Sequence, residues 1–425
     1  MKNSTPDKIL IMRVRNLSAR LFGRMQFPAL LALASSLILL VFVKTPFSKS
    51  MPSHWDLAQQ LLQGKRLADT AYPIGYPVFL ALNLYWGGLW GVFLSQGILY
   101  LAILFLSYRL LRALEVDQNG ALLACALIAF HPYLLLNIKR ILDSNLATFL
   151  TIAFVLALVR LRREGLNLRR AIGYGLLFGY MVLDRQNMLS ALPLALVVLW
   201  WHGKNFARNS FLAFVSVSVG LLLIAAVTIL VKGRLSLVQK DYAAYNFYAG
   251  ANPHAFSELI RNYNAEYSIE PALAEQGIQH VPFGRPNPER AATYTRLGLT
   301  YIRQHPWKYA GLVLLKIFSL FRPDYRRASA SGIAPPGIIF LVQTLLALPL
   351  PIWIVSRWRV RRYAKPFNNV VPPLFFLWFV PFALSNVDPR LRLPMDIVLI
   401  IDTAYVWSIF NRARGNFPLS SPRRR

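Results

Sequence analysis

The chain is poor in cysteine and in acidic residues. Its 425 residues include one cysteine, Cys125, and only 18 Asp and Glu against 47 Lys and Arg. A single thiol excludes a disulfide framework, and Cys125 lies in an apolar run, so we expect it to pack in a core. The sequence has no His or Cys spacing typical of a metal site and no glycine-rich phosphate loop before a helix. Neither a metal cluster nor a soluble nucleotide site is indicated.

Charged residues of both signs are also scarce, while apolar residues are abundant. Charged residues make up 15% of the chain and hydrophobic residues 56%, whereas soluble domains carry roughly 25% charge. Several apolar runs reach the about 17–25 residues that a helix needs to cross a bilayer. The sequence therefore predicts an all-α polytopic membrane protein with about ten transmembrane helices. Their predicted limits are about 27–45, 91–110, 120–137, 143–160, 171–184, 187–201, 211–231, 333–356, 370–386 and 394–411.

The excess of basic residues follows one side of these spans. The total net charge is +29, of which +21 falls in the short segments 1–26, 108–119, 160–170, 202–210, 357–369 and 411–425. Lys and Arg in short loops mark the cytoplasmic side, so both chain ends are predicted to lie inside. The charge is then a membrane pattern rather than a nucleic-acid surface. The basic arm 1–26 and the tail 412–425 are expected to rest on anionic lipid.

The remaining segments divide the chain further. Residues 27–231 form a transmembrane module that includes an outer loop at 45–90, and residues 333–411 hold the C-terminal spans. The polar segment 232–305 is predicted to form an outer-face loop domain of short helices. Residues 306–322 are an interfacial or re-entrant helix in this interpretation, with Lys316 reaching the headgroups. The alternative is an eleventh span, which would export the basic segment 357–365.

The first outer loop holds two acids and an aromatic turn. Asp56 lies in "HWDLAQQLL", whose apolar positions follow a helical stripe, and Asp69 follows it. Asp56 is either a solvated helix residue or a general base at the membrane boundary. Tyr72 and Tyr76 belong to "AYPIGYP", a turn leading into the next span. This loop is the first candidate site.

Two further polar segments lie close to the predicted outer face. Lys139, Arg140 and Asp143 stand between two apolar runs, where they either anchor a span or grip a phosphate. Asp184 and Arg185 stand between two short spans, where they either pair with each other or leave the arginine for an anion.

The segment "DPRLRLPMDIVLIID" precedes and enters the last predicted span. Arg390 and Arg392 run against the charge bias of the outer side, which favours a specific anionic partner. Asp402 lies deeper in the span and needs a partner or a proton. Pairing among these residues is the simpler alternative.

The order of these segments resembles the GT-C superfamily of integral-membrane glycosyltransferases. The nearest likeness is to bacterial members related to the dolichyl-phosphate-mannose-protein mannosyltransferases and to the lipid A aminoarabinose transferase. The similar segments are "LAQQLLQGKRLADTAYPIGYPVFLAL", "HPYLLLNIKRILDSNLATFL", "GYGLLFGYMVLDRQNML", "YAGANPHAF", "YIRQHPWKYAGLVLLKIFSLF" and "DPRLRLP". They cover about residues 50–200, more loosely 242–322, and locally 388–396.

The resemblance implies a GT-C-like fold and transfer of a sugar from a polyprenyl-phosphate donor to a hydroxyl of a lipid, glycan or protein. An acid would deprotonate that hydroxyl, and cations would hold the donor phosphate. The implied catalytic residues are Asp56 and Asp143, with Asp69 in reserve. The implied phosphate-binding residues are Arg185, Arg390, Arg392, Lys139 and Arg140, and the implied substrate-binding residues are Tyr72, Tyr76, Asn252 and Lys316. The resemblance implies no definite cofactor beyond the polyprenyl-phosphate sugar donor, and a divalent metal stays open because members of the superfamily differ in using one.

Two other functions stay open at this stage. A transporter or flippase for polar lipids would use intramembrane charges such as Lys316 and Asp402. A catalytically inactive GT-C-like protein is the other alternative, because Ser50 and Ser144 stand where relatives carry acids. The expected location is a cell membrane, taken as a bacterial inner membrane, with the site facing the periplasm or exterior.

Overall fold

A computed structural model of the protein describes residues 51–67, 72–193, 206–236, 239–262, 265–279, 289–321, 349–360 and 392–415, with the single positions 377, 381 and 384. Throughout these residues the secondary structure is helical, with no strand. The predicted spans near 27–45 and 370–386 lie outside or almost outside the described residues, as do both basic ends except 412–415. The all-α prediction is confirmed for the described part.

Four described helices are long and apolar enough to cross a membrane. They are α3 (Gly75–Ala113), α6 (Ser144–Glu164), α9 (Phe206–Lys232) and α19 (Leu393–Gly415). Large apolar side chains remain exposed on α3 and α9, among them Trp90, Phe214 and Leu230. Such surfaces are stable in lipid and costly in water. The chain is therefore an all-α polytopic membrane protein.

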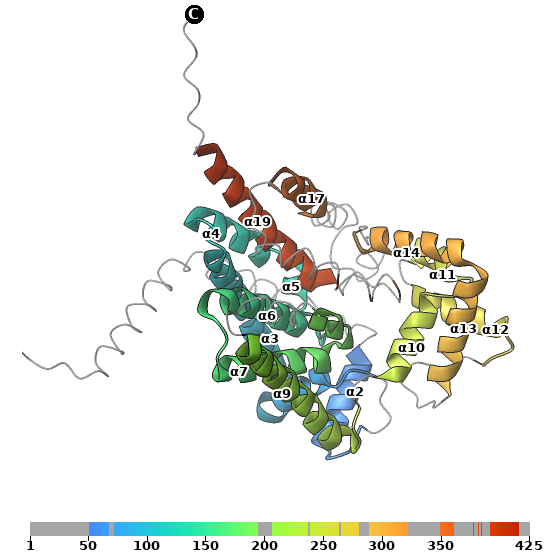
Figure 1. Cartoon of the computed structure of the whole chain (residues 1–425). Coiled ribbons are helices and arrows are strands. Elements are labelled where there is room, and N and C mark those ends of the chain that lie inside the picture. Colours follow the sequence, from blue (N-terminus) through green and yellow to red (C-terminus); the bar gives the residue numbers. More distant parts are fainter. Residues whose placement is uncertain are drawn as a thin grey trace, which may run out of the picture.

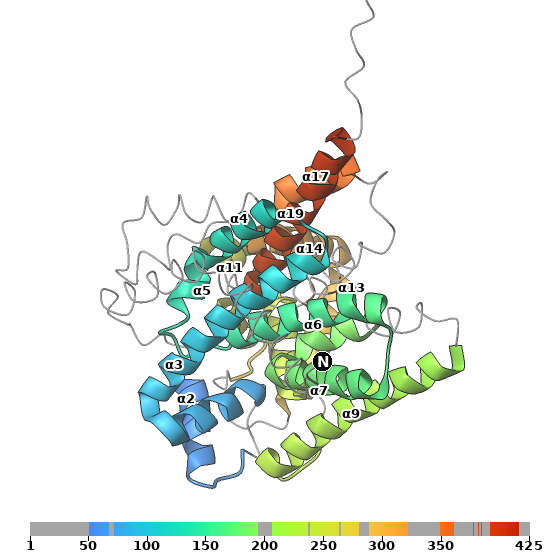
Figure 2. The ribbon, with the colours of Figure 1, turned by 90° about the vertical axis from the view of Figure 1, so that its left-hand side faces the viewer.

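The helix α19 lies among the other helices of the transmembrane part (Figures 1 and 2). It contacts α3, α4 (Gln118–Ala129), α6 and α17 (Pro349–Val360). All described residues from 392 to 402 are buried, including Asp396 and Asp402. Cys125 of α4 is also fully buried, as predicted for a core thiol. The last predicted span is thus the central helix of the bundle rather than a peripheral one.

A glycine pair joins α7 (Leu168–Asp184) closely to α9. A Cβ atom on Gly175 would lie 2.3 Å from the carbonyl oxygen of Ser216, and one on Gly179 would lie 2.7 Å from that of Gly220. Small residues four apart allow two backbones to approach in this way. The G-x-x-x-G pattern of the sequence therefore has a packing role, and it fixes the helix that ends at Asp184.

Two predicted spans belong to segments that are interrupted in the structure. The helix α3 begins at Gly75, because Pro77 fits the first helical turn, and the predicted span 91–110 falls in its later part. A kink follows at Gly88, whose φ of 56° is available to glycine. In the predicted span 120–137, α4 ends at Ala129 and the short α5 (Pro132–Leu136) starts anew. Pro132 cannot continue the preceding helix, so this segment is divided.

A second group of helices packs beside the transmembrane part, on the right in Figure 1. It comprises α10 (Lys240–Ala249), α11 (Ala255–Asn262), η2 (Ala265–Ser268), α12 (Ile269–Ala274), α13 (Arg290–Gln304) and α14 (Pro306–Phe321). Buried tyrosines hold it together: Tyr245 and Tyr248 of α10 lie beside Tyr294 of α13. The helices α10 to α13 fall within residues 232–305, and an outer-face domain formed by these residues stays a prediction.

Candidate functional site

The turn "AYPIGYP" brings α3 against the end of α7. A Cβ atom on Gly75 would lie 2.5 Å from the backbone nitrogen of Asp184, so only glycine permits this contact. The Tyr180 hydroxyl of α7 donates a hydrogen bond to the Gly75 carbonyl oxygen at 3.2 Å. The contact places the start of α3, with Tyr76, beside the sequence neighbours Asp184 and Arg185. The motif thus assembles a site from segments more than a hundred residues apart.

At this junction Arg185 forms an ion pair with Asp143. The Arg185 Nε donates to Asp143 Oδ2 at 2.8 Å, and Nη2 donates to the Ser144 hydroxyl at 3.4 Å. The arginine side chain is 4% exposed and the aspartate side chain 22%. Asp143 lies at the start of α6, and its partly exposed carboxylate is the part of this ion pair that a substrate can reach. The predicted alternative that Arg185 pairs with its sequence neighbour is replaced by this contact across two helices.

Two polar groups here have no hydrogen-bond partner among the described residues. They are the buried Asp184 carboxylate and the buried Nη1 of Arg185. Asp143, Asp184 and Arg185 also interact electrostatically with one another. Buried polar groups are normally hydrogen-bonded, and exceptions concentrate where a ligand is missing. The junction therefore offers a donor and a carboxylate that a substrate can engage.

Aromatic side chains surround the ion pair. His54 of α2 (Met51–Leu62) packs edge-on against Tyr72 and Tyr76, with ring centroids 5.6 and 5.2 Å apart. Tyr72 in turn lies 6.2 Å from Tyr242 of α10. The charges of Asp143 and Asp184 act on Tyr76, and Tyr242 interacts electrostatically with Arg185. We call these seven residues the Arg185 cluster: His54, Tyr72, Tyr76, Asp143, Asp184, Arg185 and Tyr242.

The predicted loop acids do not join this cluster within the described residues. Asp56 is exposed on α2, two positions along from His54, and successive helical positions differ by about 100°. The neighbours Ser53 and His54 face Tyr72 instead, and the Ser53 hydroxyl donates to the Tyr72 hydroxyl at 3.1 Å. Asp69 lies outside the described residues. A role for Asp56 or Asp69 stays a prediction.

The predicted phosphate-binding cations lie in different places. Lys139 and Arg140 are half-buried in the turn between α5 and α6, close in sequence to Asp143. Arg392 is buried and donates from Nε to Asp396 Oδ2 at 2.9 Å, with His131 Nε2 3.6 Å from the same oxygen. Arg390 lies outside the described residues. Of the predicted cations, Arg185 is the one that the structure places in the cluster.

Asn252 and Lys316, predicted to bind substrate, serve the second helical group. The Asn252 amide donates to the Tyr248 carbonyl oxygen and to the Ser268 hydroxyl, and its oxygen accepts from the His254 nitrogen. This amide is fully buried and holds the turn after α10. The contacts of Asn252 and Lys316 lie within the second helical group, so substrate binding by either residue stays a prediction.

Lys316 connects α14 to the same turn. Its Nζ donates to the Gly250 carbonyl oxygen at 2.6 Å and lies 5.2 Å from the centre of the Tyr309 ring. Burial lowers the pKa of Lys316 from its ordinary value to about 7. The expectation that Lys316 reaches the headgroups is wrong, because its side chain is fully buried.

The cluster suits proton transfer and anion binding more clearly than metal binding. Among the described residues no three acidic, His or Cys side chains gather in a group that could hold a metal ion. Asp143 can accept a proton, and Arg185 Nη1 can donate to an anion. Sequence reasoning missed His54 and Tyr242, which carry no motif of their own. Their contacts with Tyr72, Tyr76 and Arg185 reveal them.

The solved structures that are similar to this chain include two of an archaeal oligosaccharyltransferase. The archaeal oligosaccharyltransferase AglB from Archaeoglobus fulgidus, in complex with an inhibitory peptide and a dolichol-phosphate, has a TM-score of 0.51 and 12% identity; the match covers 95% of this chain and 53% of that one. A second structure, the Archaeoglobus fulgidus oligosaccharyltransferase tethered with an acceptor peptide, has a TM-score of 0.44 and 13% identity, and covers 93% and 50%.

These matches bear on the fold. The chain spans about half the length of the oligosaccharyltransferases that it matches. No protein-family model matches the chain, and no curated protein sequence matches it. At 12% identity the first match shows a shared architecture over nearly the whole chain. The protein therefore has a GT-C-like all-α membrane fold.

Proposed function

We propose that the chain is a membrane glycosyltransferase that moves a sugar from a polyprenyl-phosphate donor to a hydroxyl acceptor on the outer face of the membrane. The observation that carries the proposal is the Asp143–Arg185 pair, which stands where three helices meet in a GT-C fold. The neighbouring AglB structure holds a dolichol-phosphate, a lipid of the proposed donor class. The motif order of the sequence supports the same reaction.

The proposed mechanism uses the two members of the pair differently. Asp143 takes the proton of the acceptor hydroxyl while the acceptor oxygen forms its bond to the anomeric carbon of the sugar. The bond between that carbon and the phosphate oxygen breaks, and its electron pair stays on the leaving phosphate. The Nη1 group of Arg185 donates to that phosphate and stabilises its developing charge. Asp184 holds the orientation of Arg185 electrostatically.

The aromatic members of the cluster fit a sugar donor. The rings of Tyr72, Tyr76 and His54 offer apolar faces, and the tyrosine hydroxyls offer hydrogen bonds. A polyprenyl tail in the surrounding lipid would lie against the exposed apolar side chains of α3 and α9. Donor and acceptor would thus meet at the junction of the bundle with the second helical group.

The transporter alternative loses its main motivation. Asp402 accepts hydrogen bonds from Arg357 and Trp353 of α17, and Lys316 donates to Gly250. Buried charges with protein partners serve packing and need no transported ion. The alternative of an inactive protein rests on Ser144, which stands where relatives carry an acid. Ser144 accepts a hydrogen bond from Arg185, and the neighbouring Asp143 supplies a carboxylate at the same place. A transfer assay decides between the two.

A transfer assay tests the proposal. The full chain in nanodiscs receives a panel of radiolabelled polyprenyl-phosphate sugars with an extract of cell-envelope lipids and glycans as acceptor. We expect time-dependent transfer of label from at least one donor, lost in the Arg185→Gln variant. Arg170→Gln is the matched control and should leave transfer intact, because Arg170 is a half-buried arginine paired with Glu164 away from the cluster. Absence of transfer from every donor would remove the proposed function.

A further inference from the structure

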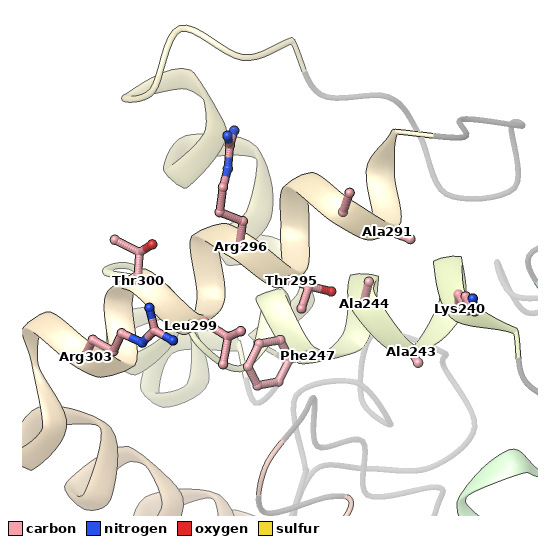
Figure 3. A pocket seen from close by; sticks show the side chains of 11 residues that line it. Lys240, Ala243, Ala244, Phe247, Ala291, Thr295, Arg296, Leu299, Thr300 and Arg303 are labelled. Atoms are coloured by element: carbon pink, nitrogen blue, oxygen red, sulfur yellow. The ribbon is translucent and has the colours of Figure 1, made fainter.

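A groove of about 910 Å³ lies between α10 and α13 (Figure 3). Its floor carries small and apolar side chains, including Ala244, Ala291, Phe247 and Leu299. The Phe247 ring lies against Gly298, where a Cβ atom would be 2.6 Å from the ring, so this glycine makes room for the aromatic floor. The groove belongs to neither the transmembrane core nor the Arg185 cluster.

The sides of the groove carry positive charge. Lys240, Arg296 and Arg303 line it, together with the hydroxyls of Thr295 and Thr300, and none of the described lining residues is acidic. All three cations are exposed, and none makes an ion pair with a described residue. Cations left without carboxylates around an apolar floor complement a ligand that combines an anionic group with an apolar body.

The helix α10 places this groove next to the Arg185 cluster. Lys240, Ala243, Ala244 and Phe247 recur at helical spacing and face the groove. Tyr242 lies on another face, where it contacts Tyr72 and interacts electrostatically with Arg185. An α-helix with its side chains is about 10–12 Å across. Groove and cluster are therefore separated by the thickness of one helix.

The opposite end of the groove leads toward a lipid-facing helix. In Figure 3, Lys240 and Arg303 lie at opposite ends of the groove. The helix α13 ends at Gln304, directly after Arg303, and α14 begins at Pro306. On α14, Trp307 is 87% exposed and Phe318 71%, as suits an amphipathic helix in the bilayer interface. The Arg303 end is thus close to the level at which lipid headgroups lie.

We infer that this groove is the acceptor subsite, and that the acceptor is a membrane lipid with a phosphate-bearing headgroup. Arg303 holds the phosphate and Arg296 adds positive charge along the same helix, the alanine and phenylalanine floor receives the apolar part of the lipid, and the hydroxyl to be glycosylated points past Lys240 toward Tyr242. This inference deepens the proposed function and rests on it. A soluble phosphate compound would not need the apolar floor, which is why the lipid is the favoured occupant.

A binding experiment without any donor tests the groove. Because Cys125 is fully buried, a thiol-reactive environment-sensitive dye can be attached selectively to an Ala292→Cys variant at the groove, with the unsubstituted chain as the blank. The full chain stays in phosphatidylcholine nanodiscs. The probes are dihexanoyl phosphatidic acid, dihexanoyl phosphatidylcholine and inorganic phosphate.

We expect a saturable spectral shift with phosphatidic acid and a much weaker one with the other two probes. The Arg296→Gln, Arg303→Gln double variant should raise the Kd about 10- to 100-fold, or about 1.4–2.7 kcal/mol, because it removes the positive charge that faces the phosphate. Lys308→Gln, an exposed cation on α14 outside the groove, should leave the Kd within about twofold. An unchanged melting temperature shows that the double variant is folded.

Three results would overturn the inference: equal affinity for phosphatidylcholine, equal affinity for inorganic phosphate, or a Kd that the double substitution does not change. The binding result is independent of transfer. A groove that binds phosphatidic acid in a protein that transfers no sugar would refute the proposed reaction and leave the groove as a lipid-binding site without an acceptor role. Transfer with no binding in the groove would refute the acceptor subsite alone.

Discussion

Replacement of Asp143 by asparagine tests the catalytic assignment most directly. Asparagine has nearly the shape of aspartate and can still accept a hydrogen bond from Arg185 Nε, which lies 2.8 Å from Asp143 Oδ2 in the native protein. It cannot take the acceptor proton. General base catalysis contributes about 10²–10⁴-fold to a rate, so we expect kcat/KM for sugar transfer to fall by that factor, or about 3–5 kcal/mol.

The same substitution should disturb the fold much less. Breaking a buried ion pair costs about 3–5 kcal/mol, but the Asp143 side chain is 22% exposed and asparagine keeps the hydrogen bond. We therefore expect a loss of stability of about 1–2 kcal/mol, seen as a modest fall in melting temperature.

The assay is transfer from the active polyprenyl-phosphate donor to its acceptor in nanodiscs, with thermal unfolding measured on the same samples. Asp117→Asn is the matched control, because Asp117 caps α4 through a hydrogen bond from the Gly120 nitrogen at 3.0 Å, and asparagine caps equally well. A folded Asp143→Asn protein with kcat/KM within about threefold of the native value would refute the general-base role.

Two further predictions concern packing and pH. Gly75→Ala should destabilise the protein by about 1–3 kcal/mol and lower transfer, because the added methyl group would overlap the α7 backbone. Gly97→Ala on the same helix is the control. Nothing lies within 4 Å of its added methyl group, so thermal unfolding should show it to be neutral or slightly stabilising. For Lys316 the folded pKa of about 7 lies below the ordinary 10.5, so the unfolded chain binds more protons between these values and stability rises with pH. Lys316→Met should remove that rise, which amounts to at most about 1.4 kcal/mol per pH unit; equal pH dependence of the two proteins in denaturation would contradict it.

The sequence predicts the architecture well where local patterns control it. Long apolar runs identify α6, α9 and α19, and the G-x-x-x-G pattern marks the close packing of α7 on α9. The predicted span 91–110 matches the part of α3 after Gly88, whereas the helical turns from Gly75 to Gly88 carry tyrosines and Asn83 and have no apolar run that marks them. The interior position of α19 could not be read from its apolar content, since a lipid-facing helix has a similar one.

The site was predictable only in part. Asp143 and Arg185 were identified as separate candidates, but their pairing joins residues 42 positions apart and depends on how α6 and α7 pack. Asp56 had the more suggestive setting, in a polar loop after a span, although its helix turns it away from the cluster. Spacing along a chain cannot reveal which face of a helix meets a distant partner.

The kink at Gly88 divides one long helix into two parts. At 1.5 Å per residue the 39 residues of α3 would extend about 58 Å, roughly twice the hydrocarbon thickness of a bilayer. Gly75 holds the first part against α7, and the second part buries one face, including Tyr100, in the core. The Gln96 amide of the second part donates to the Tyr76 hydroxyl at 2.8 Å. A residue inserted between Gly88 and Gln96 would turn Gln96 by about 100° and break that bond, so the length of the span and the aromatic part of the site are coupled.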